Sequence, residues 1–239
     1  MKILGIDSSG LVASVAVVED DVLIGEYTTN YKKTHSQTLL PMLEELKQMI
    51  DLDLATIDAI AVAGGPGSFT GLRIGSATAK GLGLALNKPI VSVPTVEALA
   101  YNLWGCERDV CVLMDARRNQ VYTGIYRFSH GKMETVTPQC AVDLMEIIAQ
   151  VNEHGRPVTF LGDGVPVFAE QLAQHCRVEY DFAPAHMNRQ RAASLCALAE
   201  LYYQEGRIQS ADEHRPDYLR LSQAERERLE RERMAQASE

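Results

Sequence analysis

The feature that most constrains the fold of this chain is a pattern that occurs twice. An apolar strand ends in an aspartate, a polar turn follows and a second strand begins, first around Asp7 and again around Asp115. Later in each half a short apolar run leads into glycines, at 64–67 and at 162–164. Internal repetition of this kind predicts two related halves. It favours a bilobed α/β protein with a cleft between the lobes, and chance similarity is the alternative.

The first half opens as an antiparallel meander. Apolar runs at 2–6, 11–18 and 22–28 alternate with polar turns and are typical of strands on a buried sheet. Asp7 and Ser8 then lie at a strand end, where a carboxylate could hold a cation or a water. An aspartate that caps its own turn is the alternative, and the sequence by itself favours it.

A glycine-rich segment, GGPGSFTGLRIG at 64–75, follows an expected strand at 57–63 and precedes an expected helix at 76–86. Its glycines Gly64, Gly65 and Gly67 permit positive φ and close backbone approach, so together with Asp7 and Ser8 they are candidate nucleotide contacts. The segment lacks the GxxxxGK of a Walker loop and the last glycine of GxGxxG. A tight connection with no ligand is the alternative.

Length, charge and cysteines narrow the class of protein. The 239 residues can form one large domain or two smaller ones, and no apolar run reaches the roughly 18 residues of a membrane span. The five cysteines form no CxxC pair, which favours reduced thiols. We therefore expect a cytoplasmic protein without a signal peptide. A net charge of −9 argues against unaided binding of a phosphate backbone, so a partner would hold any RNA.

Two helices carry candidate partner surfaces. The helix expected at 35–50 has a stripe of leucines, and Leu40, Met42 and Met49 widen its apolar arc beyond what packing on one sheet requires. In the helix after the glycine segment, Gly75, Ala79 and Gly83 recur four residues apart and predict close helix packing. An enclosing domain could cover the same apolar faces.

The rest of the chain completes two lobes. A strand at 90–93 and a helix at 95–104 precede the second meander, and a helix is expected at 189–205. The expected lobe I is 1–106 completed by the C-terminal helical segment 189–220, and lobe II is 107–188. The charged segment 221–239 is expected to be a solvated helix or a disordered tail.

With these elements placed, the sequence resembles the bacterial TsaB (YeaZ) family of tRNA threonylcarbamoyladenosine biosynthesis proteins. The motifs that carry the resemblance are LGIDSS, HSQTLLPML, IDAIAVAGGPGSFTGLRIG, VPTVEALA, DARRNQVYTGIY and PDYLR, and they span about residues 1 to 220. The resemblance implies an actin-like, Hsp70-like fold of two duplicated lobes with mixed sheets flanked by helices, the second lobe being reduced.

The resemblance also implies a function. Family members act in forming N6-threonylcarbamoyladenosine at position 37 of tRNAs that read codons beginning with A. They serve as noncatalytic partners that scaffold and activate TsaD, with the ATPase TsaE, and they form homodimers when TsaD is absent. The implied partner surface consists of His35, Ser36, Leu39, Leu40, Leu43, Leu46, Arg73, Gly75, Ala79 and Gly83.

Two departures from related proteins bear on catalysis. The paralogue TsaD holds a metal through an HxxxH segment, and the matching positions here are Thr95 and Leu99, which lack suitable donors. The second-lobe turn carries Arg117 and Arg118 where an actin-like ATPase has small residues. We therefore expect no metal and no cofactor on the isolated protein, with ATP or ADP at the complex interface. The competing interpretation is an actin-like ATPase or small-molecule kinase that uses Asp7. A metallopeptidase would need HExxH or HxxxH, and neither is present.

Overall fold

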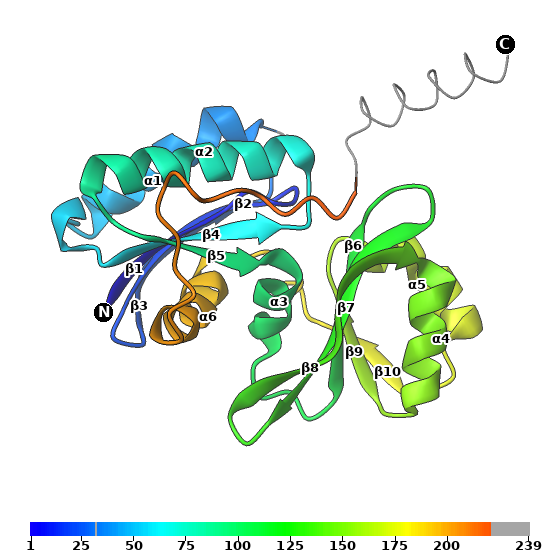
Figure 1. The fold of residues 1–239 in the computed structure, drawn as a ribbon. Coiled ribbons are helices and arrows are strands. Elements are labelled where there is room, and N and C mark those ends of the chain that lie inside the picture. Colours follow the sequence, from blue (N-terminus) through cyan, green and yellow to red (C-terminus); the bar gives the residue numbers. More distant parts are fainter. Residues whose placement is uncertain (32, 221–239) are drawn as a thin grey trace, which may run out of the picture.

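The computed structural model describes residues 1–31 and 33–220, and its central feature is a pair of five-stranded mixed sheets (Figure 1). The first sheet has the order β3-β2-β1-β4-β5 and the second, read from its other edge, β8-β7-β6-β9-β10. The strands of the first are β1 (Lys2–Asp7), β2 (Ala13–Glu19), β3 (Val22–Thr29), β4 (Ala59–Gly65) and β5 (Ile90–Pro94). Those of the second are β6 (Asp109–Asp115), β7 (Gln120–Ser129), β8 (Lys132–Asp143), β9 (Val158–Leu161) and β10 (Tyr180–Phe182). The identical order confirms the predicted duplication.

Strand pairing repeats as well. β1 pairs antiparallel with β2 and parallel with β4, while β6 pairs antiparallel with β7 and parallel with β9. Asp7 is opposite Ser14, and Asp115 is opposite Val121. Each aspartate therefore ends the central strand of its own sheet, as the repeated sequence pattern predicted.

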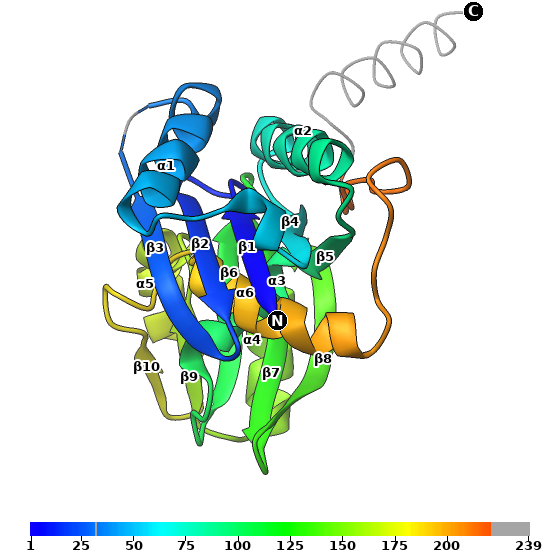
Figure 2. The same ribbon diagram turned by 90° about the vertical axis from the view of Figure 1, so that its left-hand side faces the viewer.

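The helices form three layers with the sheets between them (Figures 1 and 2). Helices α1 (His35–Met49) and α2 (Phe69–Leu86) cover the outer face of the first sheet, and α4 (Leu144–His154) and α5 (Val165–His175) cover that of the second. Between the sheets lie α3 (Thr95–Ala100), which packs on the second, and α6 (Ala192–Gln204), which packs on the first. Short 3₁₀ turns occur at Leu54–Thr56 and Tyr101–Leu103. None of the helices described is long and apolar enough to cross a bilayer.

Successive side chains of a strand point to opposite faces of the sheet, and apolar side chains form a core on both faces. Leu4 and Ile6 pack with the residues of α1 and α2, whereas Ile3 packs with Cys196 and other residues of α6. All of these side chains are buried, and each aliphatic one contributes roughly 1.5–3 kcal/mol relative to an exposed position. Strands covered on both faces explain the nearly continuous apolar runs in the sequence.

Some boundaries differ from the sequence prediction. α2 begins at Phe69 rather than at 76, because the Ser68 hydroxyl accepts a hydrogen bond from the Gly71 amide at 3.3 Å and caps the helix earlier. α6 begins at Ala192 instead of 189. α4, α5 and β10 had no specific prediction. The tail predicted at 221–239 lies outside the described residues.

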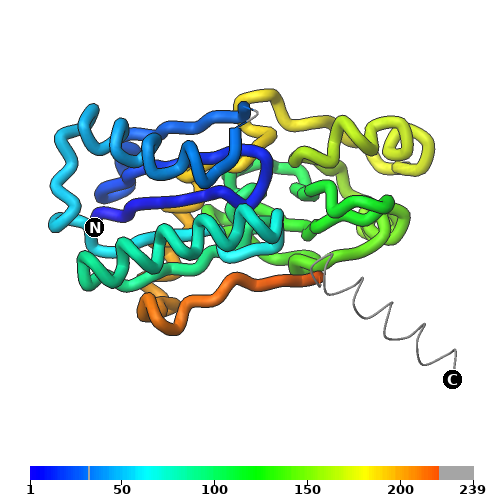
Figure 3. The backbone as a smooth tube through the Cα atoms, turned by 90° about the horizontal axis from the view of Figure 1, so that it is seen from above, coloured from blue at the N-terminus to red at the C-terminus, as the bar shows by residue number. Residues whose placement is uncertain are grey.

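The segment after α6 runs back along the β5 edge of the first sheet (Figure 3). Gln209 and Ile90 exchange two backbone hydrogen bonds of 2.8 Å, so the segment borders β5. It ends beside the second sheet, where the Arg220 guanidinium donates to the Ala116 carbonyl. We propose the lobe boundaries 1–106 with 189–220, and 107–188, on the basis of the two sheets and these contacts.

Candidate functional site

The turn after β1 and the glycine loop after β4 are in direct contact. The Ser8 hydroxyl donates to the Gly71 carbonyl at 2.8 Å, and the Ser68 amide donates to the Ser9 carbonyl at 2.7 Å. A Cβ added to Gly71 would lie 2.0 Å from the Ser8 carbonyl oxygen. Glycine is needed here because the protein's own backbone approaches so closely.

The other side of the glycine loop is covered by the C-terminal segment. The Asp217 amide donates to the Gly64 carbonyl at 2.7 Å, and a Cβ on Gly65 would lie 2.2 Å from the Asp217 carbonyl oxygen. Gly65 also has φ +114°, which L-residues rarely adopt. A Cβ on Gly67 would lie 2.4 Å from the carbonyl oxygen of Ser9. Contacts within the chain therefore account for these glycines, and their role as nucleotide contacts stays a prediction.

Asp7 is buried at the base of this contact. One of its carboxylate oxygens accepts hydrogen bonds from the Ser9 amide at 2.9 Å and the Ser9 hydroxyl at 2.6 Å. Burial raises the pKa of the Asp7 carboxyl above its ordinary value, and the Ser9 hydrogen bonds and the nearby His35 counteract that rise. This geometry is that of an aspartate capping its own turn, the alternative that the sequence favoured.

The equivalent turn of the second lobe is different. The Asp115 carboxylate accepts from the Arg117 amide at 2.8 Å and pairs with its guanidinium at 3.1 Å. Arg117, Arg118 and Asn119 all have positive φ, at 67°, 56° and 59°. Both arginines are exposed. The turn therefore presents two guanidinium groups where a phosphate-binding loop would present small residues.

The two positions matching the paralogue's metal ligands serve the fold. The Thr95 hydroxyl accepts a hydrogen bond from the Gly65 amide at 3.2 Å, and Leu99 is buried in the core beneath α3. Within residues 1–31 and 33–220, no group of three or more His, Cys, Asp or Glu side chains could hold a metal ion.

The leucines proposed as a partner surface on α1 are mostly internal. Leu39, Leu43 and Leu46 are buried against the first sheet, so their assignment to an exposed interface is wrong. Leu40 is 56% exposed and Met49 is also exposed. α1 therefore does carry apolar side chains beyond those that pack on the sheet, and they lie on its side away from the sheet.

The small residues proposed on α2 are internal too. Gly75, Ala79 and Gly83 are buried, and a Cβ on Gly75 would lie 2.6 Å from the Ser8 hydroxyl. The ridge allows α2 to approach its own sheet, so its assignment to a partner is wrong. The opposite face of α2 carries a second stripe of mostly small residues at spacings of three and four, which sequence reasoning missed: Thr70, Arg73, Ala77, Gly81 and Leu84.

The remaining predicted interface residues lie near the starts of α1 and α2. The Arg73 guanidinium lies 3.9 Å from the Phe69 ring centroid and donates to the Tyr218 hydroxyl at 3.4 Å. His35 donates through Nε2 to the Gly10 carbonyl at 2.8 Å. Ser36 is exposed. These residues stay candidates for partner contact.

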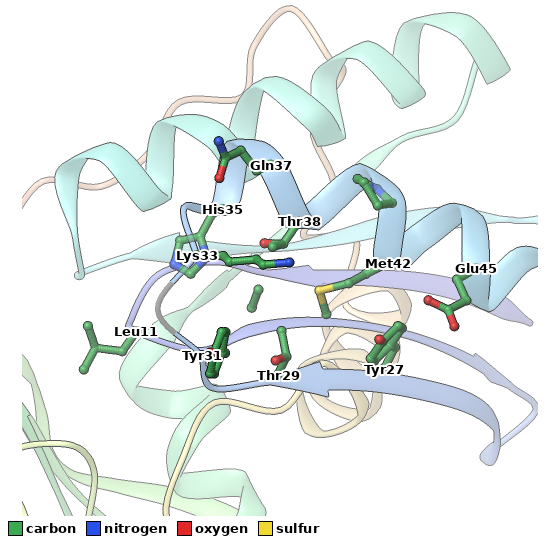
Figure 4. Close-up of a pocket in the computed structure, with 12 residues that line it drawn as sticks. Leu11, Tyr27, Thr29, Tyr31, Lys33, His35, Gln37, Thr38, Met42 and Glu45 are labelled. Carbon is green, nitrogen blue, oxygen red and sulfur yellow. The ribbon is translucent and has the colours of Figure 1, made fainter.

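A groove of about 290 Å³ runs between β3 and α1 (Figure 4). Its floor carries Tyr27 and Thr29, which point to one side because side chains two residues apart on a strand share a face, and Tyr31, which follows the end of β3. Its other residues come mainly from α1 and the chain just before it: Leu11, Ala13, Lys33, His35, Gln37, Thr38, Pro41, Met42 and Glu45. We call this the β3–α1 groove.

Comparisons with known proteins agree with the fold. A family model described as TsaD, tRNA N6-adenosine threonylcarbamoyltransferase, matches residues 22–228. The chain is 35% identical over 232 residues, 96% of its length and 99% of the relative's, to the tRNA threonylcarbamoyladenosine biosynthesis protein TsaB of Bacillus subtilis. The crystal structure of YeaZ from Pseudomonas aeruginosa superposes with a TM-score of 0.79 at 27% identity, covering 91% of this chain and 99% of that one. An Arthrobacter polyphosphate/ATP-glucomannokinase, at 10% identity over 84% of this chain and 98% of that one and a TM-score of 0.50, shares the fold alone.

Two duplicated lobes, each with a mixed sheet of the same strand order, define an actin-like protein. Within that class, the full-length similarity and the family match are decisive. The chain belongs to the TsaB (YeaZ) family of tRNA threonylcarbamoyladenosine biosynthesis proteins.

Proposed function

We propose that this protein is a noncatalytic subunit of the cytoplasmic complex that forms N6-threonylcarbamoyladenosine at position 37 of tRNA, and that it scaffolds and activates TsaD. The observation that carries the proposal is the filling of the glycine loop by the protein's own chain, at Ser8, Ser9 and Asp217. The backbone groups that would bind phosphate in an actin-like ATPase are close to other backbone groups. ATP or ADP would then bind at the interface of the complex.

The surface we assign to TsaD is the outer side of α1 and α2, defined by Leu40, Met49, Ala77, Gly81 and Leu84. Gly81 has no neighbouring heavy atom within 4 Å of an added Cβ, so a partner helix could lie against it. An apolar patch lined by small residues favours helix-on-helix packing. A second copy of this chain would use the same surface when TsaD is absent, and TsaE and tRNA would join through the complex.

Co-purification with TsaD tests this surface. Leu40→Glu with Gly81→Glu should abolish capture of TsaD, because charges would be buried in the interface. Val167→Glu is the matched control, since Val167 is exposed to the same extent as Leu40, 56%, but lies on α5. Undiminished capture by the double variant would refute the interface. Aspartates at Leu39 and Leu43 would be uninformative because those side chains belong to the core.

Complementation tests the function itself. Expression in a strain depleted of its own TsaB should restore the modified adenosine in tRNA, and Asp7→Asn should restore it equally well. An actin-like kinase or ATPase that uses Asp7 predicts the opposite: nucleotide turnover by the isolated protein that Asp7→Asn abolishes. Measured turnover of this kind would replace our proposal with the enzymatic one.

A further inference from the structure

The β3–α1 groove is separate from the surface assigned to TsaD, and of its lining residues His35 is the one that is also a candidate for partner contact and lies near Asp7. We propose that it binds one nucleotide unit of single-stranded RNA, with the base against the tyrosine rings and the phosphate at Lys33. The choice of RNA as the source of the nucleotide rests on the proposed function in tRNA modification. Because the net charge is −9, the groove would add one local contact to a tRNA that the complex holds elsewhere.

The floor of the groove offers aromatic faces to a base. Tyr27 is 37% exposed and Tyr31 is 71% exposed, so both rings are accessible to a ligand. Figure 4 shows both rings on the same side of the strand, with Thr29 between them. Stacking on exposed aromatic rings is how proteins hold single-stranded bases, because every base has a π face.

At the end of the groove next to the start of α1, the protein supplies a cation. Lys33 lines the groove, and Figure 4 shows its side chain extending along it. No ion pair is recorded for this ammonium among the residues that the structure describes. His35 also lines the groove; its Nδ1 is buried and lacks a hydrogen-bond partner within the described chain. A phosphate would pair with the Lys33 ammonium, and a ribose hydroxyl would donate to the His35 Nδ1.

The other end of the groove, further along α1, carries a negative charge. Glu45 lines it, ten residues along α1 from His35, which corresponds to about 15 Å of helix. A carboxylate accepts hydrogen bonds and repels phosphate, so this end suits the exocyclic amine of adenine, cytosine or guanine. The groove therefore suits a ligand with an anion at one end, a flat ring in the middle and an amino group at the other end. One nucleotide has this arrangement. A groove of about 290 Å³ is too small for more than such a unit.

The test uses the full-length protein and fluorescence anisotropy with labelled single-stranded hexamers, oligoadenylate and oligouridylate. We expect oligoadenylate to bind more tightly than oligouridylate. Tyr31→Ala should weaken binding of oligoadenylate about fivefold to a hundredfold, while Tyr31→Phe keeps it because the ring remains. Lys33→Gln should lower the slope of log affinity against log salt by about 0.7, the value for one phosphate of a single strand. Glu45→Ala, which removes the acceptor for the exocyclic amine, should reduce the preference for oligoadenylate.

These substitutions are at exposed positions, and unchanged urea unfolding confirms that each variant folds. Absence of oligoadenylate binding, or equal binding by Tyr31→Ala, overturns the proposal. If unlabelled AMP competes as well as the hexamer, the ligand is a free nucleotide and the assignment to RNA is wrong. If only an extended peptide competes for the groove, it is a protein-docking site instead. Tyr31→Ala should capture TsaD as well as the unaltered protein does. Loss of RNA binding and loss of TsaD binding are therefore separate results, and each tests its own proposal.

Discussion

Gly65 and Gly162 occupy equivalent places in the two lobes, one at the end of β4 and the other directly after β9, with φ angles of +114° and +117°. In each case a Cβ would lie 2.2 Å from a carbonyl oxygen. The oxygen belongs to Asp217 in the first lobe and to Leu113, on the neighbouring strand, in the second. Duplication has preserved the backbone conformation, while this glycine contacts a distant segment in the first lobe and a strand of its own sheet in the second.

The sharpest test of this difference is to place a side chain at each glycine. Gly162→Ala should cost about 5 kcal/mol, since it combines a forbidden φ with a clash against a buried strand. Gly65→Ala should cost clearly less, because the segment around Asp217 can move away. Urea unfolding measures both. Gly81→Ala, in open space on α2, is the control and should stabilise by about 0.5–1 kcal/mol. A larger loss for Gly65→Ala would show that the C-terminal segment cannot be displaced.

The two lobes also differ in the ion pairs at the start of their central strands, β6 and β1. Asp109 of β6 is buried and accepts from the Arg127 guanidinium at 2.7 and 2.9 Å, with Arg156 at 3.3 Å. The Lys2 ammonium of β1 pairs with the partly exposed Glu19 carboxylate at 3.3 Å and donates to the Thr56 hydroxyl at 3.1 Å. Asp109→Ala should cost about 1.5–3 kcal/mol, because it removes the charge-assisted hydrogen bonds of a buried carboxylate while the two arginines stay partly exposed. Lys2→Ala should cost less than about 1 kcal/mol. Similar losses in chemical denaturation would contradict the contrast.

Acid should loosen the first lobe in particular. His214 of the C-terminal segment is fully buried; burial, with Lys80 and Arg215 nearby, lowers its pKa from 6.5 to about 4. The unfolded chain therefore binds the proton more readily, and stability is lost as pH falls from 6.5 through 4, by up to about 3 kcal/mol. His214→Gln should remove this part of the pH dependence. Unfolding at pH 7, 5.5 and 4 measures it, and equal acid sensitivity of the two proteins would refute the assignment.

The sequence predicted the duplication and the strand order around Asp7 and Asp115 because periodicity and turn residues are local signals. It could not decide which face of a helix meets the sheet. Both Ala79 and Ala77 lie in stripes of small residues on α2, and only the packing shows that the first is buried and the second exposed. The contact of Gly65 with Asp217 joins residues that are 152 positions apart in the sequence, so no local pattern encodes it.

The C-terminal segment also sets an order of assembly during synthesis. Residues 109–182 contain every strand of the second sheet, so this lobe can fold as soon as it has left the ribosome. The first lobe is translated earlier but waits for α6 and Asp217, which come from the chain's last fifth. Until then the inner face of its sheet, with Ile3 and Val91, lacks its cover. The half that is made first is therefore the half that is finished last, and the inner face of its sheet stays uncovered until α6 has been made.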